Sequence, residues 1–320
     1  MTTSANSANP ATPERLRLQD SPELPGVVAT DLSFESAGVR LAATLYTPAP
    51  GGEHGEGPWP GVLVTGAWTT VKEQMPGTYA RELAARGLAA LTFDFRGWGA
   101  SEGTPRYVED PITKTEDLHA AADFLATLPQ VDASRLSGLG ICASSGYMAA
   151  AVADHPALGR LALVAPWLHD PAMAEAVYGG PESVAALIAA SRQAEKEEAI
   201  LTAASLTDET APMYQAPYYT EEGRGLIPAY DNRFNVRTWE PWLTYDAQAF
   251  ADRLSAPTLI LCSEAAALPA GAHAYVERLT AGPGAPVTEI WLDEVSQFDF
   301  YDRRDVVHRC ADALAEHFTA

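Results

Sequence analysis

One stretch, residues 137–147 (SGLGICASSGY), constrains the fold more than any other part of the chain. An apolar run ends at Gly140, one residue precedes Cys142, and small residues then lead into an alanine-rich segment of helical character. A strand, a sharp turn and a helix in this order form the G-x-Nuc-x-G pattern, which places a nucleophile at the tip of the turn. The flanking positions, Gly140 and Ser144, must be small so that the strand and helix backbones can approach each other.

A second frame would put Ser144 at the tip of this turn, between Cys142 and Gly146. We disfavour it because Gly140 would then lie inside the approach to the turn rather than two positions before its tip. Cys142 is therefore the predicted nucleophile. The alternative interpretation is a buried structural cysteine at the end of a strand.

The composition sets the class of protein. With 320 residues, of which 47% are hydrophobic and 20% charged, the chain is long enough for one large α/β domain that carries an insertion. The formal net charge of −21 argues against nucleic acid and anionic membranes as partners, because both repel an acidic protein. We therefore expect a small-molecule substrate, while the sequence leaves the oligomeric state open.

The three cysteines, Cys142, Cys262 and Cys310, lie far apart and show no metal-ligand spacing. So sparse a set favours a reducing cytoplasm over a disulfide framework, and we expect neither a metal nor another cofactor. Residues 1–24 are rich in Ser, Thr, Pro and Asn without an apolar core, which predicts a disordered tail rather than a signal peptide. No apolar run is long enough to cross a membrane.

Strand and helix patterns alternate through most of the chain. Residues 27–33 and 39–46 predict two antiparallel strands around a turn at 36–38. Apolar runs, typical of strands covered on both faces, occupy 59–65, 88–95 and 161–166, and the segments 258–262 and 287–292 complete the alternation as further strands. Helices are predicted over 75–86, 113–128 (opened by a Thr113–Glu116 capping box), 270–279 and the last segment, where Val307, Cys310, Leu314 and Phe318 share a face. This alternation predicts a mostly parallel central sheet with helices on both faces.

The alternation is interrupted over residues 171–246. Residues 182–206 are rich in Ala, Glu and Lys and predicted to be helical, and the remainder is dense in aromatic residues. A segment inserted after a sheet strand lies above the carboxyl edge of the sheet, where active sites form. We therefore predict a lid over 171–246 on a core of 25–170 and 247–320, with an aromatic inner wall for a largely apolar substrate. The candidate substrate-binding residues are Tyr218, Tyr219, Tyr230, Trp239 and Trp242, with plain packing of the lid as the alternative role.

Together, the nucleophile turn, the VLVTGAW and FDFRGWGASEG loops and the position of the insertion resemble the α/β-hydrolase superfamily over about residues 27–318. The motifs VKEQM, GICAS and FDFYDR look like the dienelactone-hydrolase-like subgroup. The resemblance implies the α/β-hydrolase fold and an oxyanion hole formed by backbone N–H groups of Ala143 and of the loop with Ala67 and Trp68. Thr65 stands where members often have a histidine, a change that leaves the backbone donors in place.

The resemblance also implies a histidine just before the FDFYD motif, where this chain has Gln297. A glutamine amide is not basic and cannot carry a proton between nucleophile and leaving group. Glu264, after the 258–262 strand, is the candidate acid, although Ala266 occupies the position where many members have aspartate. The predicted site therefore has an incomplete triad.

His169 is the one histidine of seven that we expect at the carboxyl edge of the sheet. Two interpretations stay open: a relocated base that pairs with Cys142, or a satisfied loop histidine. Because Cys142 opens a helix, the helix dipole favours its thiolate, and we expect a thiol pKa modestly below the free-cysteine value of about 8.5.

Three functions are compatible with these residues. The first is non-hydrolytic chemistry (elimination, cyclisation or isomerisation) on a carbonyl- or ester-bearing, largely apolar metabolite of specialised metabolism, using the retained oxyanion hole. The second is a cysteine-dependent esterase, thioesterase or acyl transferase. The third is a non-catalytic ligand-binding protein. We favour the first, because releasing an acyl group to water normally requires a general base.

Overall fold

A central sheet organises the chain, of which the computed structural model describes residues 13–16, 25–282, 284 and 286–320. Its strand order is β1-β2-β4-β3-β5-β6-β11-β12. The strands are β1 Val27–Ser36, β2 Val39–Pro48, β3 Trp59–Thr65, β4 Ala89–Phe93, β5 Val131–Ile141, β6 Leu158–Val164, β11 Thr258–Cys262 and β12 Val287–Trp291. The pairs β1–β2 and β2–β4 are antiparallel, and every later neighbour is parallel, which confirms the predicted mostly parallel sheet.

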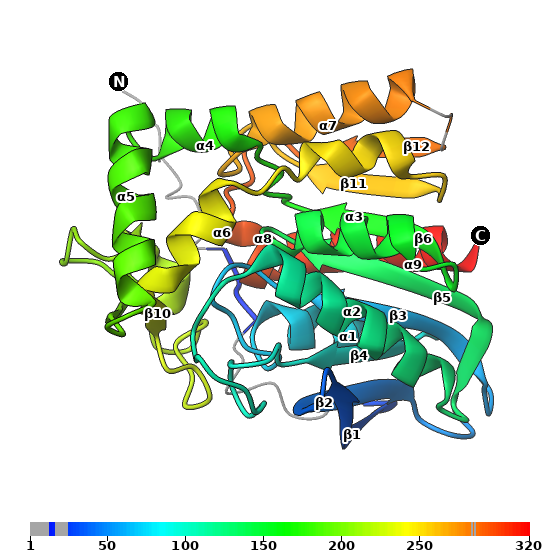
Figure 1. Cartoon of the computed structure of the whole chain (residues 1–320). Helices are drawn as coiled ribbons and strands as arrows, with labels where there is room; N and C mark the ends of the chain where they lie inside the picture. Colours follow the sequence, from blue (N-terminus) through cyan, green and yellow to red (C-terminus); the bar gives the residue numbers. More distant parts are fainter. Residues whose placement is uncertain (1–12, 17–24, 283, 285) are drawn as a thin grey trace, which may run out of the picture.

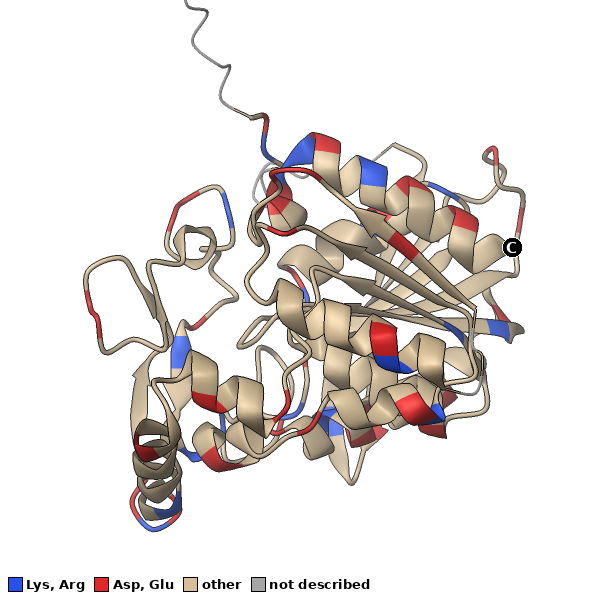
Figure 2. Ribbon diagram, turned by 90° about the horizontal axis from the view of Figure 1, so that it is seen from above, with Lys and Arg blue, Asp and Glu red and all other residues tan. Residues whose placement is uncertain are grey.

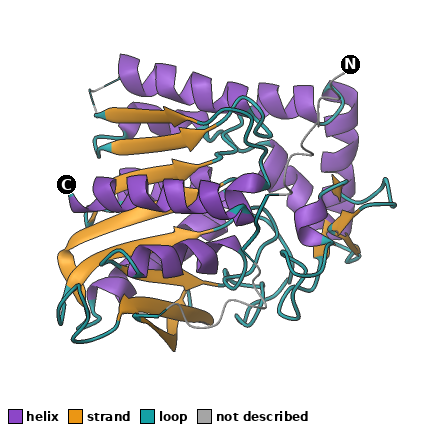
Figure 3. Cartoon of the chain, turned by 180° about the vertical axis from the view of Figure 1, so that it is seen from behind, coloured by secondary structure: helices purple, strands orange, loops and turns teal. Residues whose placement is uncertain are grey.

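Helices cover both faces of the sheet. Helices α1 (Met75–Ala84) and α9 (Arg304–Thr319) lie on one face, and α2 (Pro111–Ala126), α3 (Ser144–Asp154) and α7 (Pro269–Ala281) lie on the other (Figures 1 and 3). The apolar face predicted for the last helix is buried against the sheet: Val307, Cys310, Leu314 and Phe318 are all at most 3% exposed. The predicted two-faced covering is therefore confirmed.

Two local predictions need correction. Helix α2 does not begin with a Thr113–Glu116 capping box: its N-cap is Asp110, which accepts hydrogen bonds from the N–H groups of Ile112 and Thr113, and Pro111 occupies the first turn. Proline is favoured there because the first helical N–H groups lack intrahelical partners. The helix predicted over 182–206 is shorter, because α5 spans Pro181–Ala194.

Residues 171–246, the inserted segment, contain α4 (Pro171–Val177), α5, α6 (Trp239–Leu243), short strands and 3-10 turns. The short elements are β7 Ile200–Thr202, β8 Ala204–Ser205, β9 Met213–Tyr214, η1 Pro217–Tyr219, β10 Arg233–Asn235 and η2 Val236–Thr238, and η3 Gln248–Arg253 follows the segment. Figure 1 shows α4, α5, α6 and β10 gathered at one end of the sheet. A further short helix, α8 (Asp299–Asp302), lies between β12 and α9.

The predicted disordered tail, 1–24, lies outside the described residues except for 13–16, which pack on α8 and the start of α9. Leu16 N–H donates to the Asp302 carbonyl at 2.6 Å, and Arg304 N–H donates to the Glu14 carbonyl at 2.9 Å. Charged residues lie mostly on the helices and loops around the sheet (Figure 2). Within the described part of the chain, no helix has the length and apolar character needed to cross a bilayer.

Candidate active site

Cys142 stands at the tip of the turn between β5 and α3, in the left-handed conformation with φ +57°. Its neighbours explain this geometry. A Cβ added at Gly140 would lie 2.7 Å from Ser145 Cα, so only glycine fits two positions before the tip. Ser144 Oγ is bonded to the Ile141 backbone inside the first turn of α3 and is fully buried. Cys142, and not Ser144, therefore stands at the tip of the turn.

Two backbone N–H groups contact the sulfur of Cys142 as hydrogen-bond donors. One belongs to Ala143 and the other to Trp68, in the loop after β3. A carbonyl oxygen bound beside the sulfur would lie within reach of both donors, the arrangement of an oxyanion hole. Ala67, the other residue considered for this role, instead holds the loop, because its carbonyl accepts hydrogen bonds from Thr70 N–H at 3.3 Å and Oγ1 at 2.6 Å.

The side chain of Gln297 reaches this site through a tyrosine. Its Nε2 donates to the Ala165 carbonyl and to the Tyr301 hydroxyl, each at 2.9 Å, and its Oε1 accepts from Ala267 N–H at 2.9 Å. Because the Ala267 N–H can only donate, it fixes which way the amide faces. The Tyr301 hydroxyl then has its own hydrogen for the sulfur of Cys142, its other partner. Position 297 therefore supplies neutral hydrogen bonds and no base.

The thiol does not have the lowered pKa that we expected from the helix start. Burial raises the pKa of Cys142 above its ordinary value, and the hydrogen bonds from Tyr301, Ala143 and Trp68 only partly oppose this. The side chain is 8% exposed, so a thiolate would lose most of its hydration, a cost that exceeds the effect of the helix dipole. Cys142 is therefore a protonated thiol at neutral pH.

A cavity of about 400 Å³ opens beside Cys142 and Tyr301. Its described lining is apolar, aromatic or neutral, with no acidic, basic or histidine side chain, and consists of Trp68, Cys142, Ala143, Trp167, Tyr178, Pro212, Met213, Tyr214, Ala216, Tyr219, Trp242, Ala265, Ala267, Ser296, Gln297, Phe298 and Tyr301. The core lining residues follow β3, β5, β6, β11 and β12, whose carboxyl ends share one edge of the sheet. The inserted segment supplies the facing wall.

The structure does not bring Glu264 or His169 to this cavity. Glu264 accepts a hydrogen bond from His273 at 2.8 Å in an exposed pair, so it does not orient any group at position 297. His169 is 1% exposed, and its Nδ1 accepts from Trp167 Nε1 at 3.1 Å while Nε2 donates to the Trp242 carbonyl at 2.8 Å. With both nitrogens occupied and burial lowering its pKa, His169 fits the structural role and not that of a base for Cys142.

The aromatic candidates divide into two groups. Tyr219 and Trp242 line the cavity. The others stand behind the wall: the Tyr218 ring lies 5.1 Å from that of Tyr301, the Trp239 ring lies 5.8 Å from that of Trp68, and the Tyr230 hydroxyl lies 3.2 Å from Thr69 Oγ1. The second group therefore supports the lining residues instead of contacting a ligand.

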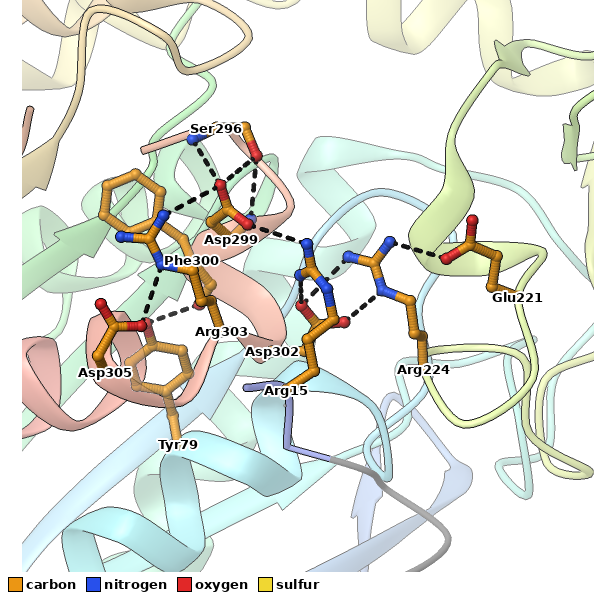
Figure 4. A network of polar contacts seen from close by, with 10 residues as sticks. All are labelled: Arg15, Tyr79, Glu221, Arg224, Ser296, Asp299, Phe300, Asp302, Arg303 and Asp305. Atoms are coloured by element: carbon orange, nitrogen blue, oxygen red, sulfur yellow. Dashed lines mark hydrogen bonds and ion pairs between the residues drawn. The ribbon is translucent and has the colours of Figure 1, made fainter. Parts of the chain in front are cut away.

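An ion-pair cluster holds α8, the helix that carries Tyr301 (Figure 4). Asp302 is 1% exposed and pairs with two arginines from distant segments. Arg224 of the inserted segment contacts it at 2.5 and 3.1 Å, and Arg15 reaches it from the N-terminal side. Arg15 also lies 3.2 Å from Asp299. The position of Tyr301 is therefore coupled to the inserted segment.

Sequence reasoning missed Tyr301, Tyr178 and Phe298. Tyr301 could have been found from its spacing, because it lies four residues after Gln297 and residues one helical turn apart face the same side. Tyr178, whose hydroxyl accepts from Trp242 Nε1 at 2.9 Å, follows α4 and carried no comparable pattern.

Comparisons with known proteins agree with this architecture. Residues 59–309 match a family described as the alpha/beta hydrolase family. An uncharacterised protein of Escherichia coli (strain K12), YcjY, is 31% identical over 245 residues, 71% of this chain and 78% of the relative. A polyketide transferase of Gibberella fujikuroi is 27% identical over 267 residues, 74% of this chain and 80% of the relative. The crystal structure of hypothetical protein PA2218 from Pseudomonas aeruginosa superposes with a TM-score of 0.76 at 26% identity, covering 92% and 95% of the two chains.

Proposed function

The chain belongs to the alpha/beta hydrolase family, and we propose that it is an enzyme that closes a ring within an uncharged, largely apolar, carbonyl-bearing metabolite without hydrolysing it. The observation that carries this proposal is the amide of Gln297, which gives both of its hydrogens to Ala165 and Tyr301. No described lining residue is a carboxylate or histidine that could activate a water molecule. Ordinary ester hydrolysis is therefore expected to be slow.

Ring closure needs less from the protein than hydrolysis does. In an intramolecular addition, an enol carbon of the substrate attacks the carbon of a second carbonyl group in the same molecule. The enol proton ends on the oxygen of that second carbonyl group. The N–H groups of Trp68 and Ala143 can stabilise the negative charge that develops on that oxygen. The cavity holds the substrate in a folded conformation that brings the two reacting carbons together, so the reaction needs no second reactant.

Two observations support the class of substrate. The cavity wall is built from aromatic rings and small side chains and offers no counter-charge, so it suits an uncharged and mostly apolar molecule. The Gibberella fujikuroi relative is named a polyketide transferase, which supports a place in specialised metabolism. Polyketide-like chains carry the several carbonyl groups that this reaction needs.

A second candidate is acyl transfer through Cys142, which the name of that relative and the thiol at the turn favour. In this reaction the sulfur would bond to the acyl carbon of a thioester, and the donor thiol would leave with the Cys142 proton. The oxygen of an acceptor hydroxyl would then bond to the acyl carbon, the S–C bond would break, and the hydroxyl proton would return to the sulfur. The raised pKa of Cys142 makes its first step slow at neutral pH.

One experiment separates these functions. Wild type and Cys142→Ala are incubated with synthetic β-polyketoacyl thioesters and with p-nitrophenyl esters, and products and intact protein are analysed by mass spectrometry. Ring closure gives a product of unchanged mass, or one lighter by water after dehydration, and leaves the protein unmodified. An acyl adduct on Cys142 would favour transfer, brisk release of free acid would contradict the proposal, and binding without conversion would indicate a non-catalytic protein.

A further inference from the structure

A buried ion pair between Glu109 and Lys114 lies behind the nucleophile turn. Lys114 Nζ is 2.5 Å from Glu109 Oε1, and the two residues are 3% and 0% exposed. The ammonium group also lies 4.5 Å from the ring centre of Phe95 and 5.0 Å from that of Trp98. The desolvation free energy of two buried charges offsets much of their mutual attraction, so a contribution to stability does not by itself explain such a pair. The other hydrogen bonds that the Glu109 carboxylate accepts are more informative.

The Glu109 carboxylate is bonded to both elements that carry the oxyanion-hole donors. Its Oε2 accepts from the N–H of Thr69, the residue after Trp68, at 3.1 Å. Its Oε1 accepts from the Tyr147 hydroxyl at 3.0 Å, and Tyr147 lies on α3, whose N-cap is Ala143. The loop needs this support, because Thr69 is a β-branched residue at φ +64°.

The same residue also contacts the inserted segment. Glu109 N–H donates to Thr238 Oγ1 at 2.9 Å, and Thr238 directly precedes α6, which carries Trp242 of the cavity wall. Glu109 itself is fully buried and is absent from the described lining. It therefore acts through other residues and does not touch a ligand.

We propose that Glu109 is a positioning residue for the oxyanion hole: its carboxylate fixes the Trp68 loop against the nucleophile helix α3, and its ion pair with Lys114 holds that carboxylate in place. The inference rests on the proposed function, because both concern the same two N–H donors. It predicts that neutralising Glu109 misplaces one donor relative to the other while Cys142 stays at the turn.

An alkyl trifluoromethyl ketone tests this geometry without any turnover. The thiol of Cys142 adds across the ketone, so an S–C bond forms, the thiol proton moves to the carbonyl oxygen and nothing leaves. The new oxygen lies in the oxyanion hole, and fluorine NMR reports both the affinity and the chemical shift of the adduct. For Glu109→Gln we expect about tenfold weaker binding and a shifted resonance, because loss of one whole donor in such a hole costs about 10²–10³-fold in rate.

Asp117→Asn is the matched control. It neutralises another fully buried carboxylate, that of Asp117 on α2, whose hydrogen bonds come from Arg96 at 2.8 and 3.0 Å and not from the Trp68 loop. We expect this variant to lose stability while the adduct keeps its affinity and resonance. If Glu109→Gln does not fold, Tyr147→Phe removes only the hydrogen bond between Tyr147 and Glu109 and should weaken the adduct several-fold.

Three outcomes would overturn the inference. The first is an adduct whose affinity and resonance are unchanged in Glu109→Gln or Tyr147→Phe. The second is an equal loss of adduct affinity in Asp117→Asn, which would indicate a general effect of lower stability. A wild-type protein that forms no more adduct than Cys142→Ala would remove the oxyanion hole itself, and with it the proposed function.

Discussion

Gln297 donates an amide hydrogen to the Tyr301 hydroxyl, 2.9 Å away, and so directs the hydroxyl's own hydrogen to the sulfur of Cys142. The order of donors fixes what the site can do. An imidazole at position 297 could take a proton from the thiol, whereas this amide can only help to donate one toward it. The chain of hydrogen bonds therefore favours stabilising negative charge over creating a nucleophile.

Replacing Gln297 with histidine should raise hydrolysis of p-nitrophenyl esters about tenfold, which is less than the roughly 10²–10⁴-fold that a well-positioned base contributes. The gain stays small because Glu264 faces His273 and cannot orient the new ring. Ring closure should fall in the same variant. Initial rates in wild type, Gln297→His and Gln297→Asn give the comparison, with the asparagine variant expected to show no gain. Brisk wild-type hydrolysis that His169→Ala abolishes would refute this account.

Replacing Tyr301 with phenylalanine should raise the pKa of Cys142 further, because the thiolate loses a hydrogen bond that lowers it. A hydrogen bond to a charged group contributes about 1.5–3 kcal/mol, so alkylation by iodoacetamide near neutral pH should slow about tenfold or more. Tyr219→Phe is the control, since Tyr219 also lines the cavity but is not a hydrogen-bond partner of the sulfur. Equal rates in the two variants would contradict the assigned hydrogen bond.

The two arginines that pair with Asp302 should differ in their contribution to stability. Arg224→Ala removes the more deeply buried partner of Asp302, 9% exposed, together with its contact to Glu221, and should cost about 3 kcal/mol. Arg15 is 31% exposed, so Arg15→Ala should cost about 1 kcal/mol or less. Urea unfolding of both variants provides the measurement. A comparable loss in both would mean that the N-terminal residues hold α8 as firmly as the inserted segment does.

Asp94 should make stability fall as pH rises from about 4 to about 6. Burial raises its pKa from 3.8 to about 6, so over this range the folded chain holds a proton that the unfolded chain has released. The loss amounts to about 3 kcal/mol, since each pKa unit corresponds to 1.36 kcal/mol. Asp94→Asn lacks this pH-dependent loss. The free energy of unfolding of the variant minus that of wild type, measured in urea, should therefore increase between pH 4 and pH 7. Parallel pH curves for the two proteins would disprove this contribution.

The strands were predictable because continuous apolar runs record burial on both faces. The predicted 59–65 and 258–262 strands match β3 and β11 at both ends. The start of α2 could not be predicted in the same way, because two capping patterns compete there. Thr113 and Glu116 match a capping box, but the helix begins three residues earlier with Asp110 as its N-cap. Local signals compete at helix ends, and the chain keeps the one that also satisfies the first N–H groups.

At the site, position along the chain predicted more than side-chain direction did. Cys142, Trp68 and Gln297 follow different strands of one parallel sheet, so their meeting at one edge follows from topology. His169 also follows such a strand, yet the Trp167 indole and the Trp242 carbonyl hold its ring away from the cavity. Those bonds depend on tertiary packing that no local pattern records.

The cavity without charged side chains also determines which form of a ligand it selects. A carboxylate that entered would give up its hydration and find no cation among the described lining residues, inside a protein whose net charge is −21. The neutral ester, ketone or lactone pays no such penalty. The protein should therefore discriminate strongly between a metabolite and its free acid, and this preference should persist at high salt, because it arises from dehydration and not from long-range attraction.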